Sequence, residues 1–567
     1  MAFKRFVMPI FFVFFLVACS APSDTTKSEK TGSTDSAPHP DMILFGGPIY
    51  TGLDNQIVEA VAVTDGRITA VGNADDLLAQ PDTKVKKLDL KGAALFPGFT
   101  DSHAHLVGIG LREMTVNLEN VGSIKELVET IERITDDANE NDTIYGAGWI
   151  ETGWPEGRMP TRDDLDPVSA NIPVILERAD FHAALVNTAA LEAAGITDET
   201  EDPDGGRIER DENGRATGLL IDNAFSLVAP LMAQPTDDQK RDTYIIGGEV
   251  YAAYGWSGIH NMSVDPGDVE IIETLSEGDR LGLRIYNALT QEGLAMLADR
   301  GHQTSDNGRV MTRAVKLYID GALGSRGAAL SAPYSDAPET SGLTLLEKEK
   351  AADLFGAAIR NDIQITTHAI GDRGNKIVLD WYEEVFQTAP SDNVRWRIEH
   401  AQILHTEDIP RFAQLGVIPS MQPSHAIGDL HFAPDRLGPN RLQGAYAWRS
   451  LIDSGAIIVG GSDAPVERGD PLIEFYAAVA RKDLEGFQGP DWQPEQAVSR
   501  IEALKMFTLW PAIASFREDE LGTIEIGKRA DFTAFAKDIM TIPAEDIPSA
   551  TPVLTVVDGA IIFSDLD

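Results

Sequence analysis

Eight short strand-like segments limit the folds open to this chain more than any other feature of its sequence. Each has the length of a β-strand, and the last four recur roughly every 30–40 residues, the spacing of one strand plus one helix. This repeat predicts an α/β fold, a (β/α)8 TIM barrel over residues 97–514. The predicted strands are 94–103, 258–264, 283–289, 314–320, 363–368, 394–400, 416–421 and 456–463.

Two further regions surround this barrel. The interval after the first strand is too long for one helix, so residues 107–250 are predicted to form an inserted subdomain, which in barrels commonly supplies a lid or a pocket wall. Both ends of the chain contain short strands separated by Asp-Gly and Gly-Gly turns. We therefore expect a small β-sandwich domain that is built from residues 41–96 and 515–567 and flanks the barrel.

The N-terminal sequence predicts an export signal. Lys4 and Arg5 precede an apolar run over residues 6–18, which is too short to span a bilayer and typical of a signal-peptide core. The run ends in Leu-Val-Ala before Cys19, which resembles the cleavage site of bacterial lipoproteins. The resemblance implies that residues 1–18 are removed and that Cys19 is lipidated. The alternative is a plain secretory signal with an incidental cysteine.

The lipid would hold the protein at the cell envelope, facing the periplasm or the exterior. Residues 19–40 are rich in Ser, Thr, Lys, Asp and Pro, which predicts a disordered tether. Ser20 does not resemble an inner-membrane retention signal, so the outer membrane is favoured. We expect the lipid anchor to be the only contact with the membrane.

Composition excludes other classes of function. The net charge is 47 − 89 = −42, and so acidic a surface repels nucleic-acid phosphates, so we expect no nucleic-acid partner. Cys19 is the only cysteine, which excludes intrachain disulfides and cysteine-rich metal sites. Any metal must therefore be bound through nitrogen and oxygen atoms.

The strongest chemical signal is the sequence PGFTDSHAH at residues 97–105. Residues two apart on a strand point to the same side, so His103 and His105 can bind one ion together. Three later segments also end in a side chain that can bind metal. These residues are His368, His400 and Asp463. Because the carboxyl ends of the strands form the mouth of a barrel, all five are expected to converge there on one or two zinc-like ions.

A lysine inside an apolar strand is unusual. Lys316 lies within the segment 314–320, and burying its charge is costly unless the amine is paired or chemically altered. From the residues alone, a salt bridge to an acidic neighbour is the simpler interpretation.

Together these motifs resemble the metal-dependent amidohydrolase superfamily, in its amidohydrolase-3 type and close to the YtcJ-like branch. The similarity covers roughly residues 41–563. It is carried by residues 97–105, by KLYIDGALGSR at 316–326, THAIGD at 367–372, RIEHAQ at 397–402, GSDAP at 461–465 and GTIEIGKRADF at 522–532.

The resemblance implies a set of metal ligands. In that family the lysine matching Lys316 can be carboxylated by CO₂ and bridge two ions, of which zinc is the expected one. Members of the wider superfamily use one ion or two. The implied ligands are His103, His105, Lys316 and Asp463 for one ion, and Lys316, His368 and His400 for the other.

The implied activity is hydrolysis of a non-peptide C–N bond in an amide-like small molecule by a metal-activated hydroxide. Asp463 would act as the general base and then as the general acid, leaving a carboxylate and an amine. An esterase or lactonase that uses the same site is one alternative. A non-catalytic ligand-binding lipoprotein is another, although every ligand position carries a coordinating residue.

Several further side chains are weaker candidates. His260, in segment 258–264, is expected to point toward the mouth and either to support the metal ligands or simply to pack. Four others are expected to contact substrate, each with a structural alternative such as core packing or an ion pair. They are Trp149, His182, Arg326 and His425.

Overall fold

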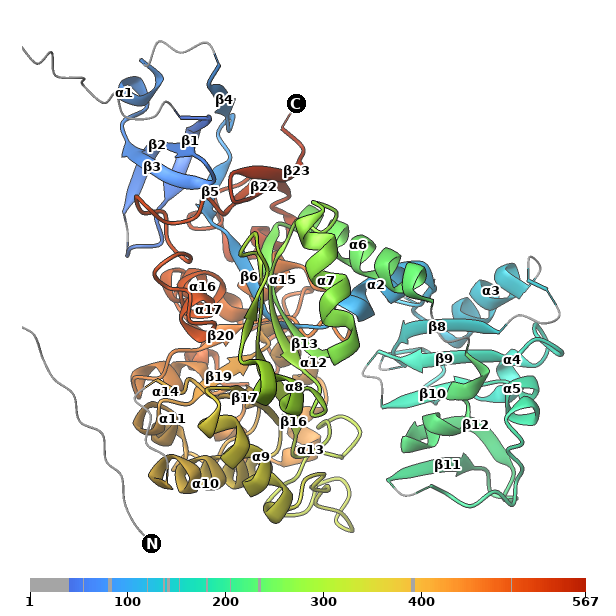
Figure 1. Ribbon diagram of the computed structural model, residues 1–567. Coiled ribbons are helices and arrows are strands. Elements are labelled where there is room, and N and C mark those ends of the chain that lie inside the picture. Colours follow the sequence, from blue (N-terminus) through green and yellow to red (C-terminus); the bar gives the residue numbers. More distant parts are fainter. Residues whose placement is uncertain are drawn as a thin grey trace, which may run out of the picture. The chain divides into compact units, whose positions relative to one another are not determined.

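The computed structural model describes residues 40–566 with short gaps (Figure 1). The predictions for residues 1–39, which include lipidation of Cys19, lie outside the described residues. Among the residues described, no helix has both the length and the apolar character needed to cross a membrane. The gaps are 55, 80–83, 120, 136–137, 140–142, 152, 180–181, 204, 233–235, 389–392 and 491.

A parallel sheet of eight strands forms the centre of the molecule, and the strands follow one another in the sheet as they do in the chain. Its first and last strands meet, because Asp463 N donates to His103 O at 2.7 Å and His105 N donates to Ala464 O at 2.8 Å. The predicted α/β TIM barrel is therefore confirmed. The strands are β6 (Phe99–Ala104), β13 (Trp256–Val264), β14 (Arg284–Leu289), β16 (Val310–Tyr318), β17 (Gln364–Ala369), β18 (Arg397–His400), β19 (Ile418–Met421) and β20 (Val459–Gly460).

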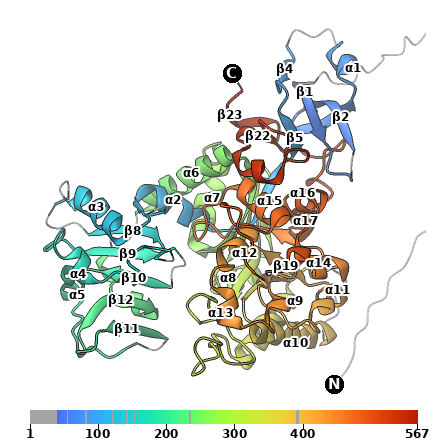
Figure 2. The ribbon, with the colours of Figure 1, turned by 180° about the vertical axis from the view of Figure 1, so that it is seen from behind.

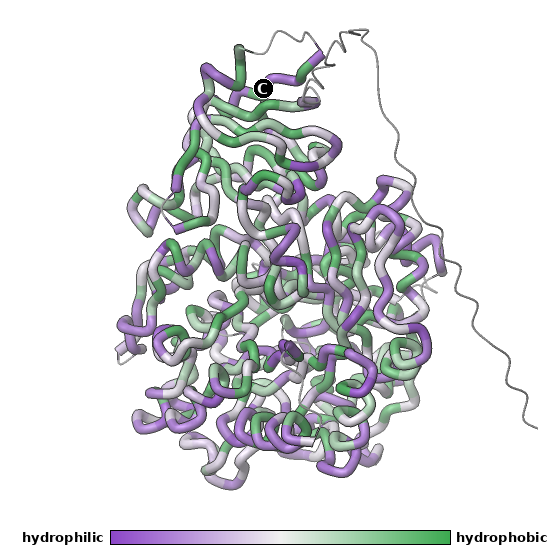
Figure 3. Tube along the Cα trace, turned by 60° about the vertical axis from the view of Figure 1, so that its left-hand side comes forward, coloured by the Kyte–Doolittle hydropathy of each residue, from purple (hydrophilic) through white to green (hydrophobic). Residues whose placement is uncertain are grey.

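Helices link successive strands and cover the outside of this sheet (Figures 1 and 2). Their inner faces are apolar; on α9, for example, Ala351, Phe355 and Ala358 are fully buried in the main core. Hydrophilic residues gather on the peripheral loops and helices (Figure 3). The linking helices are α7 (Val269–Glu277), α8 (Gly293–Arg300), α9 (Lys348–Arg360), α10 (Asp372–Thr388), α11 (Ile409–Leu415), α12 (Pro423–Asp429), α13 (Ala433–Leu437) and α14 (Trp448–Asp453), and α15 (Pro471–Ala480), α16 (Arg500–Phe507) and α17 (Leu509–Ala514) follow the last strand.

Both ends of the described chain join in a second sheet. The predicted first strand divides at Gly98: β5 (Ala94–Pro97) pairs with β21 from the C-terminal region, and β6 enters the barrel. The strands of this second sheet are joined by hydrogen bonds into a single sheet. The predicted sandwich of two sheets therefore stays a prediction. The strands are β1 (Met42–Tyr50), β2 (Ile57–Thr64), β3 (Arg67–Gly72), β4 (Lys86–Asp89), β5, β21 (Phe532–Phe535), β22 (Pro552–Val557) and β23 (Ala560–Ser564).

The insertion after the first barrel strand contains a third sheet, and this sheet spans a narrower range than the predicted 107–250. Helices α2 (Leu106–Met114) and α6 (Asp237–Tyr254) pack closely, since a Cβ on Gly110 would lie 1.9 Å from Thr243 O. The two helices therefore form one unit beside the barrel, and the inserted sheet lies between them in sequence. Its strands are β7 (Val116–Asn117), β8 (Ile144–Trp149), β9 (Val174–Arg178), β10 (Ala183–Val186), β11 (Gly206–Arg210) and β12 (Ala216–Asp222).

Candidate metal centre

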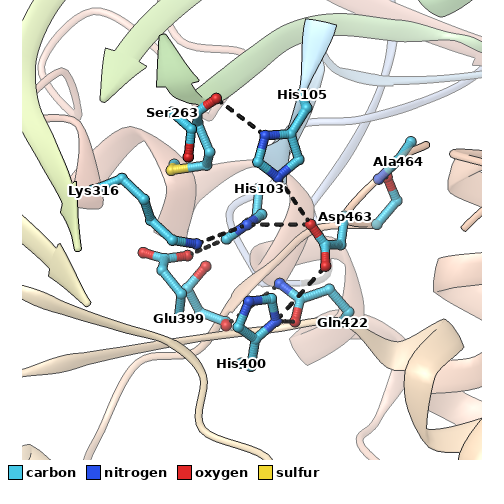
Figure 4. A network of polar contacts seen from close by, with 12 residues as sticks. His103, His105, Ser263, Lys316, Glu399, His400, Gln422, Asp463 and Ala464 are labelled. Atoms are coloured by element: carbon cyan, nitrogen blue, oxygen red, sulfur yellow. Dashed lines mark hydrogen bonds and ion pairs between the residues drawn. The ribbon is translucent and has the colours of Figure 1, made fainter. Parts of the chain in front are cut away.

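The side chains predicted to bind metal meet at the carboxyl end of the barrel strands (Figure 4). His103 Nε2 lies 3.3 Å from Asp463 Oδ1 and 3.2 Å from Lys316 Nζ, and His105 Nε2 lies 3.3 Å from the same Asp463 oxygen. His103, His400 and Asp463 each offer a ligand atom within 4.8 Å of the other two. The ring of His368 is centred 4.5 Å from that of His400. The structure thus brings all six predicted ligands together.

Each of the four imidazoles has one ring nitrogen engaged outside the cluster. Nδ1 of His103 contacts Glu399 Oε2 at 2.5 Å, and Nδ1 of His105 contacts the carbonyl of Met262 at 3.1 Å. Nδ1 of His400 contacts Gln422 Oε1 at 2.9 Å, and Nε2 of His368 contacts the carbonyl of Gly321 at 3.5 Å. These partners are all acceptors, so each imidazole donates its N–H to them. The second nitrogen of each ring is therefore left with a free lone pair for a metal.

The protonation states also favour metal binding. Burial lowers the pKa of His105, His368 and His400, so these rings are neutral near pH 7. Burial alone would raise the pKa of Asp463, but His103 and the other nearby rings hold it well below its usual range. Neutral imidazoles with an ionised carboxylate are the nitrogen and oxygen donors that zinc and similar divalent cations prefer. The residues present therefore fit a divalent metal.

Lys316 lies inside this cluster with 2% of its surface exposed. Burial lowers its pKa from 10.5 to about 8, although Glu399 and Asp463 favour its charged form. Among the described residues no carboxylate forms an ion pair with Lys316, so the simple salt bridge is absent. A buried amine that titrates near pH 8 has an appreciable neutral fraction at physiological pH.

Glu399 was not among the predicted site residues, yet it holds His103. It is fully buried, and its other oxygen lies 2.8 Å from Arg397 Nε. Burial would raise the pKa of Glu399, but Arg397 and His103 lower it far below its usual range. A signal for this pair was present, because Arg397 and Glu399 are two charged residues on the same face of an apolar strand.

A second network fixes Asp463 relative to His103. Asp101 Oδ1 accepts from the backbone N–H groups of His103 and Ser462, both at 3.0 Å, and Oδ2 accepts from Ser462 Oγ at 2.6 Å and Tyr251 OH at 3.0 Å. Asp101 therefore ties β6 to the segment after β20. Asp463 itself has a φ of +63°, a strained conformation of the kind that functional sites often retain.

A cavity of about 1180 Å³ opens above the cluster, between the barrel mouth and the inserted sheet. Three of the four predicted substrate contacts line it: His182, Arg326 and His425. His182 Nδ1 contacts Asp222 at 2.8 Å, and Arg326 pairs with Asp336 at 2.8 Å. Two acidic residues of the wall, Glu467 and Asp429, were not predicted, and no motif in the sequence marked them.

Two weaker predictions have clear structural outcomes. The prediction that Trp149 contacts substrate is wrong: its side chain is fully buried in the core of the insertion, packs on Trp154 and donates to Leu176 O at 2.9 Å. His260 does not reach the ligands directly. Its Nδ1 accepts from Arg397 at 2.8 Å, so it contacts the residue that holds Glu399.

Comparison with known proteins gives a consistent result. The profile described as "Amidohydrolase family" matches residues 86–563. YtcJ of Bacillus subtilis (strain 168) is 34% identical over 92% of this chain and 99% of its own length, and N-substituted formamide deformylase of Arthrobacter pascens is 30% identical over 92% and 98%. The crystal structure of an uncharacterized metal-dependent hydrolase from Pyrococcus horikoshii OT3 superposes with a TM-score of 0.72 at 27% identity, covering 89% of this chain and 99% of that one.

Proposed function

The chain belongs to the amidohydrolase family, and from this premise we propose that it uses bound zinc to hydrolyse a non-peptide C–N bond in an amide-like small molecule. One observation carries the proposal: four imidazoles, each with one ring nitrogen held by a neighbouring acceptor, meet at the barrel mouth beside the buried carboxylate of Asp463, and Nε2 of both His103 and His105 lies 3.3 Å from its Oδ1. Such a set has no evident structural use without a cation. The name of the deformylase relative, which specifies an N-substituted formamide, supports amide-like substrates.

The proposed ligands are His103, His105, His368, His400, Asp463 and carboxylated Lys316. When bound there, a divalent cation supplies Lewis-acid chemistry, polarising a carbonyl and lowering the pKa of water. Asp463 is proposed as the group that accepts a proton from the attacking water and delivers it to the departing nitrogen. Its carboxylate borders the cavity, and 7% of the residue is exposed.

Carboxylation of Lys316 is proposed because the neutral form of an amine is the form that reacts with CO₂. The lowered pKa of Lys316 makes that form accessible, and the product carries a negative charge among nitrogen ligands, where it would bridge two ions. His182 and Arg326 are proposed to contact the substrate from the cavity wall, since each remains at the cavity surface despite its acidic partner.

Export and lipidation of Cys19 are proposed on the N-terminal sequence alone. Labelling of the expressed protein with a fatty-acid analogue tests this directly. The label is expected in the wild type and absent from a Cys19→Ala variant. A labelled variant would contradict the proposal.

The activity is tested by separating metal dependence from bond specificity. The protein is purified, depleted with a chelator and reloaded with zinc, and each form is assayed on secondary formamides, acylated amines, and esters and lactones of matched acyl groups. We expect zinc-dependent release of amines. Hydrolysis of esters and lactones alone would favour the esterase reading, and ligand binding without turnover by any form would favour a binding protein.

A further inference from the structure

One polar atom on the cavity wall is left without a partner. Nε2 of His425 forms no hydrogen bond with any described residue, although nine-tenths of the side chain is buried. Two carboxylate oxygens lie near it, Asp463 Oδ2 at 3.8 Å and Glu467 Oε1 at 3.9 Å. Both distances are too long for a direct hydrogen bond, and both are short enough for one intervening atom to bond to both ends.

The tautomer of His425 is set by a neighbouring amide. Nε2 of Gln402 lies 3.1 Å from His425 Nδ1, and an amide nitrogen can only donate, so Nδ1 is the acceptor. The ring hydrogen is therefore on Nε2, which is the atom that faces Asp463 and Glu467. The ring is also held in place by stacking on His400, with centroids 5.9 Å apart.

Glu467 completes the arrangement from the segment after Asp463. Its side chain is 32% exposed and lines the cavity, and among the described residues no lysine or arginine pairs with it. Burial and the nearby Asp429 and Asp463 raise the pKa of Glu467 to about 8, so near pH 7 it is largely protonated and accepts through its C=O oxygen. Two acceptor oxygens thus lie within 3.9 Å of one N–H donor, His425 Nε2. An atom placed between them would need two hydrogens to donate and one lone pair to accept.

From this complementarity we propose that His425, Asp463 and Glu467 form a pocket for the leaving nitrogen of the substrate, with His425 as a catalytic residue. This inference rests on the proposed amide hydrolysis. In the substrate amide the nitrogen lone pair is delocalised and the group is planar. Once the carbonyl carbon is tetrahedral, that lone pair takes the proton from Asp463. A pair for His425 Nε2–H appears on the nitrogen only as the C–N bond breaks, so that hydrogen bond strengthens in the transition state.

The bond changes are those of simple hydrolysis. The oxygen of one water molecule bonds to the carbonyl carbon, and Asp463 passes one proton of that water to the nitrogen lone pair. The C–N bond then breaks and leaves its electron pair on the nitrogen. A secondary amide thereby yields a primary amine with two N–H groups, which match the oxygens of Asp463 and Glu467. The pocket therefore selects secondary amides over N-methylated amides, because the methyl group leaves an acceptor unpaired.

The test compares a secondary amide, its N-methyl analogue and an aryl ester of the same acyl group, using zinc-loaded protein. We expect the wild type to prefer the secondary amide to the N-methyl amide by at least about tenfold in kcat/KM. His425→Phe keeps the stacked ring; it should lower kcat for the amide about 10–100-fold with little change in KM, and affect the ester far less. Glu467→Leu, which removes that acceptor, should shrink the preference for the secondary amide. Zinc content should be unchanged in both variants.

Gln402→Glu provides an independent check. A carboxylate at this position accepts a hydrogen bond from His425 Nδ1–H, so the ring hydrogen of His425 moves from Nε2 to Nδ1. The fall in kcat for the amide should then match that of His425→Phe. His431→Phe, at a partly exposed histidine that pairs with Asp483, is the matched control. Equal losses on amide and ester in His425→Phe, or no preference against the N-methyl amide, would overturn the pocket while leaving amide hydrolysis intact. Turnover of the ester alone by the wild type would overturn both proposals.

Discussion

Replacing Glu399 with glutamine tests whether the buried Arg397–Glu399–His103 chain holds the metal centre in shape. The substitution keeps the size of the side chain and an acceptor for His103 Nδ1, but it removes the negative charge. A charge-assisted hydrogen bond contributes about 1.5–3 kcal/mol and a neutral one about 0.5–1.5 kcal/mol. The loss at His103 is therefore about 1–1.5 kcal/mol, or about five- to twelvefold in zinc affinity.

Stability should fall as well, because Arg397 is fully buried and loses its carboxylate partner. Removing one member of a buried pair typically costs about 3–5 kcal/mol. Zinc affinity is measured by competition with a chelator, and the free energy of unfolding by urea titration of metal-free protein. Glu384→Gln is the control, because Glu384 pairs with Lys348 on the surface and both side chains are more than half exposed. Wild-type affinity and stability in Glu399→Gln would refute the reasoning.

Three further substitutions have outcomes set by burial. Lys316→Met should stabilise the metal-free protein at pH 7 by up to about 3 kcal/mol, because a lysine pKa lowered from 10.5 to about 8 destabilises the folded state below pH 8. Urea titrations at several pH values should show the wild type gaining stability between about pH 8 and 10.5. The variant should show no such gain. Arg284→Met should cost about 3–5 kcal/mol in the same assay, because Arg284 in β14 pairs with Asp531 at 2.6 Å and ties the barrel to the terminal sheet; an unchanged unfolding midpoint would contradict this. Gly110→Val should lower the melting temperature measured by calorimetry more than Gly428→Val does. A Cβ at Gly110 would meet Thr243 O at 1.9 Å, whereas at Gly428, which is also helical, the nearest atom lies 3.9 Å away.

The barrel and the ligands were predictable because both depend on local patterns. An apolar strand that ends in His or Asp places that side chain at the mouth of the barrel, whatever the rest of the chain does. His103, His368, His400 and Asp463 follow this rule, and the structure brings them together.

Other features depend on contacts between distant segments. The residues that orient the imidazoles come from several strands and loops, and only the fold shows that Gln422 lies beside His400 or that the Met262 carbonyl lies beside His105. Trp149 illustrates a second limit, since an aromatic side chain fills a core or lines a pocket with the same sequence signature. The packing of α2 on α6 is another such contact, since no local pattern in the sequence shows that these two helices lie together.

The central claim is that the barrel mouth binds a divalent metal through six side chains, those of His103, His105, Lys316, His368, His400 and Asp463. Elemental analysis of the purified mature protein, beside a Lys316→Ala variant, tests it most directly. We predict close to two zinc ions per chain in the wild type and a sharp fall in the variant. An absence of metal from both proteins would contradict the account.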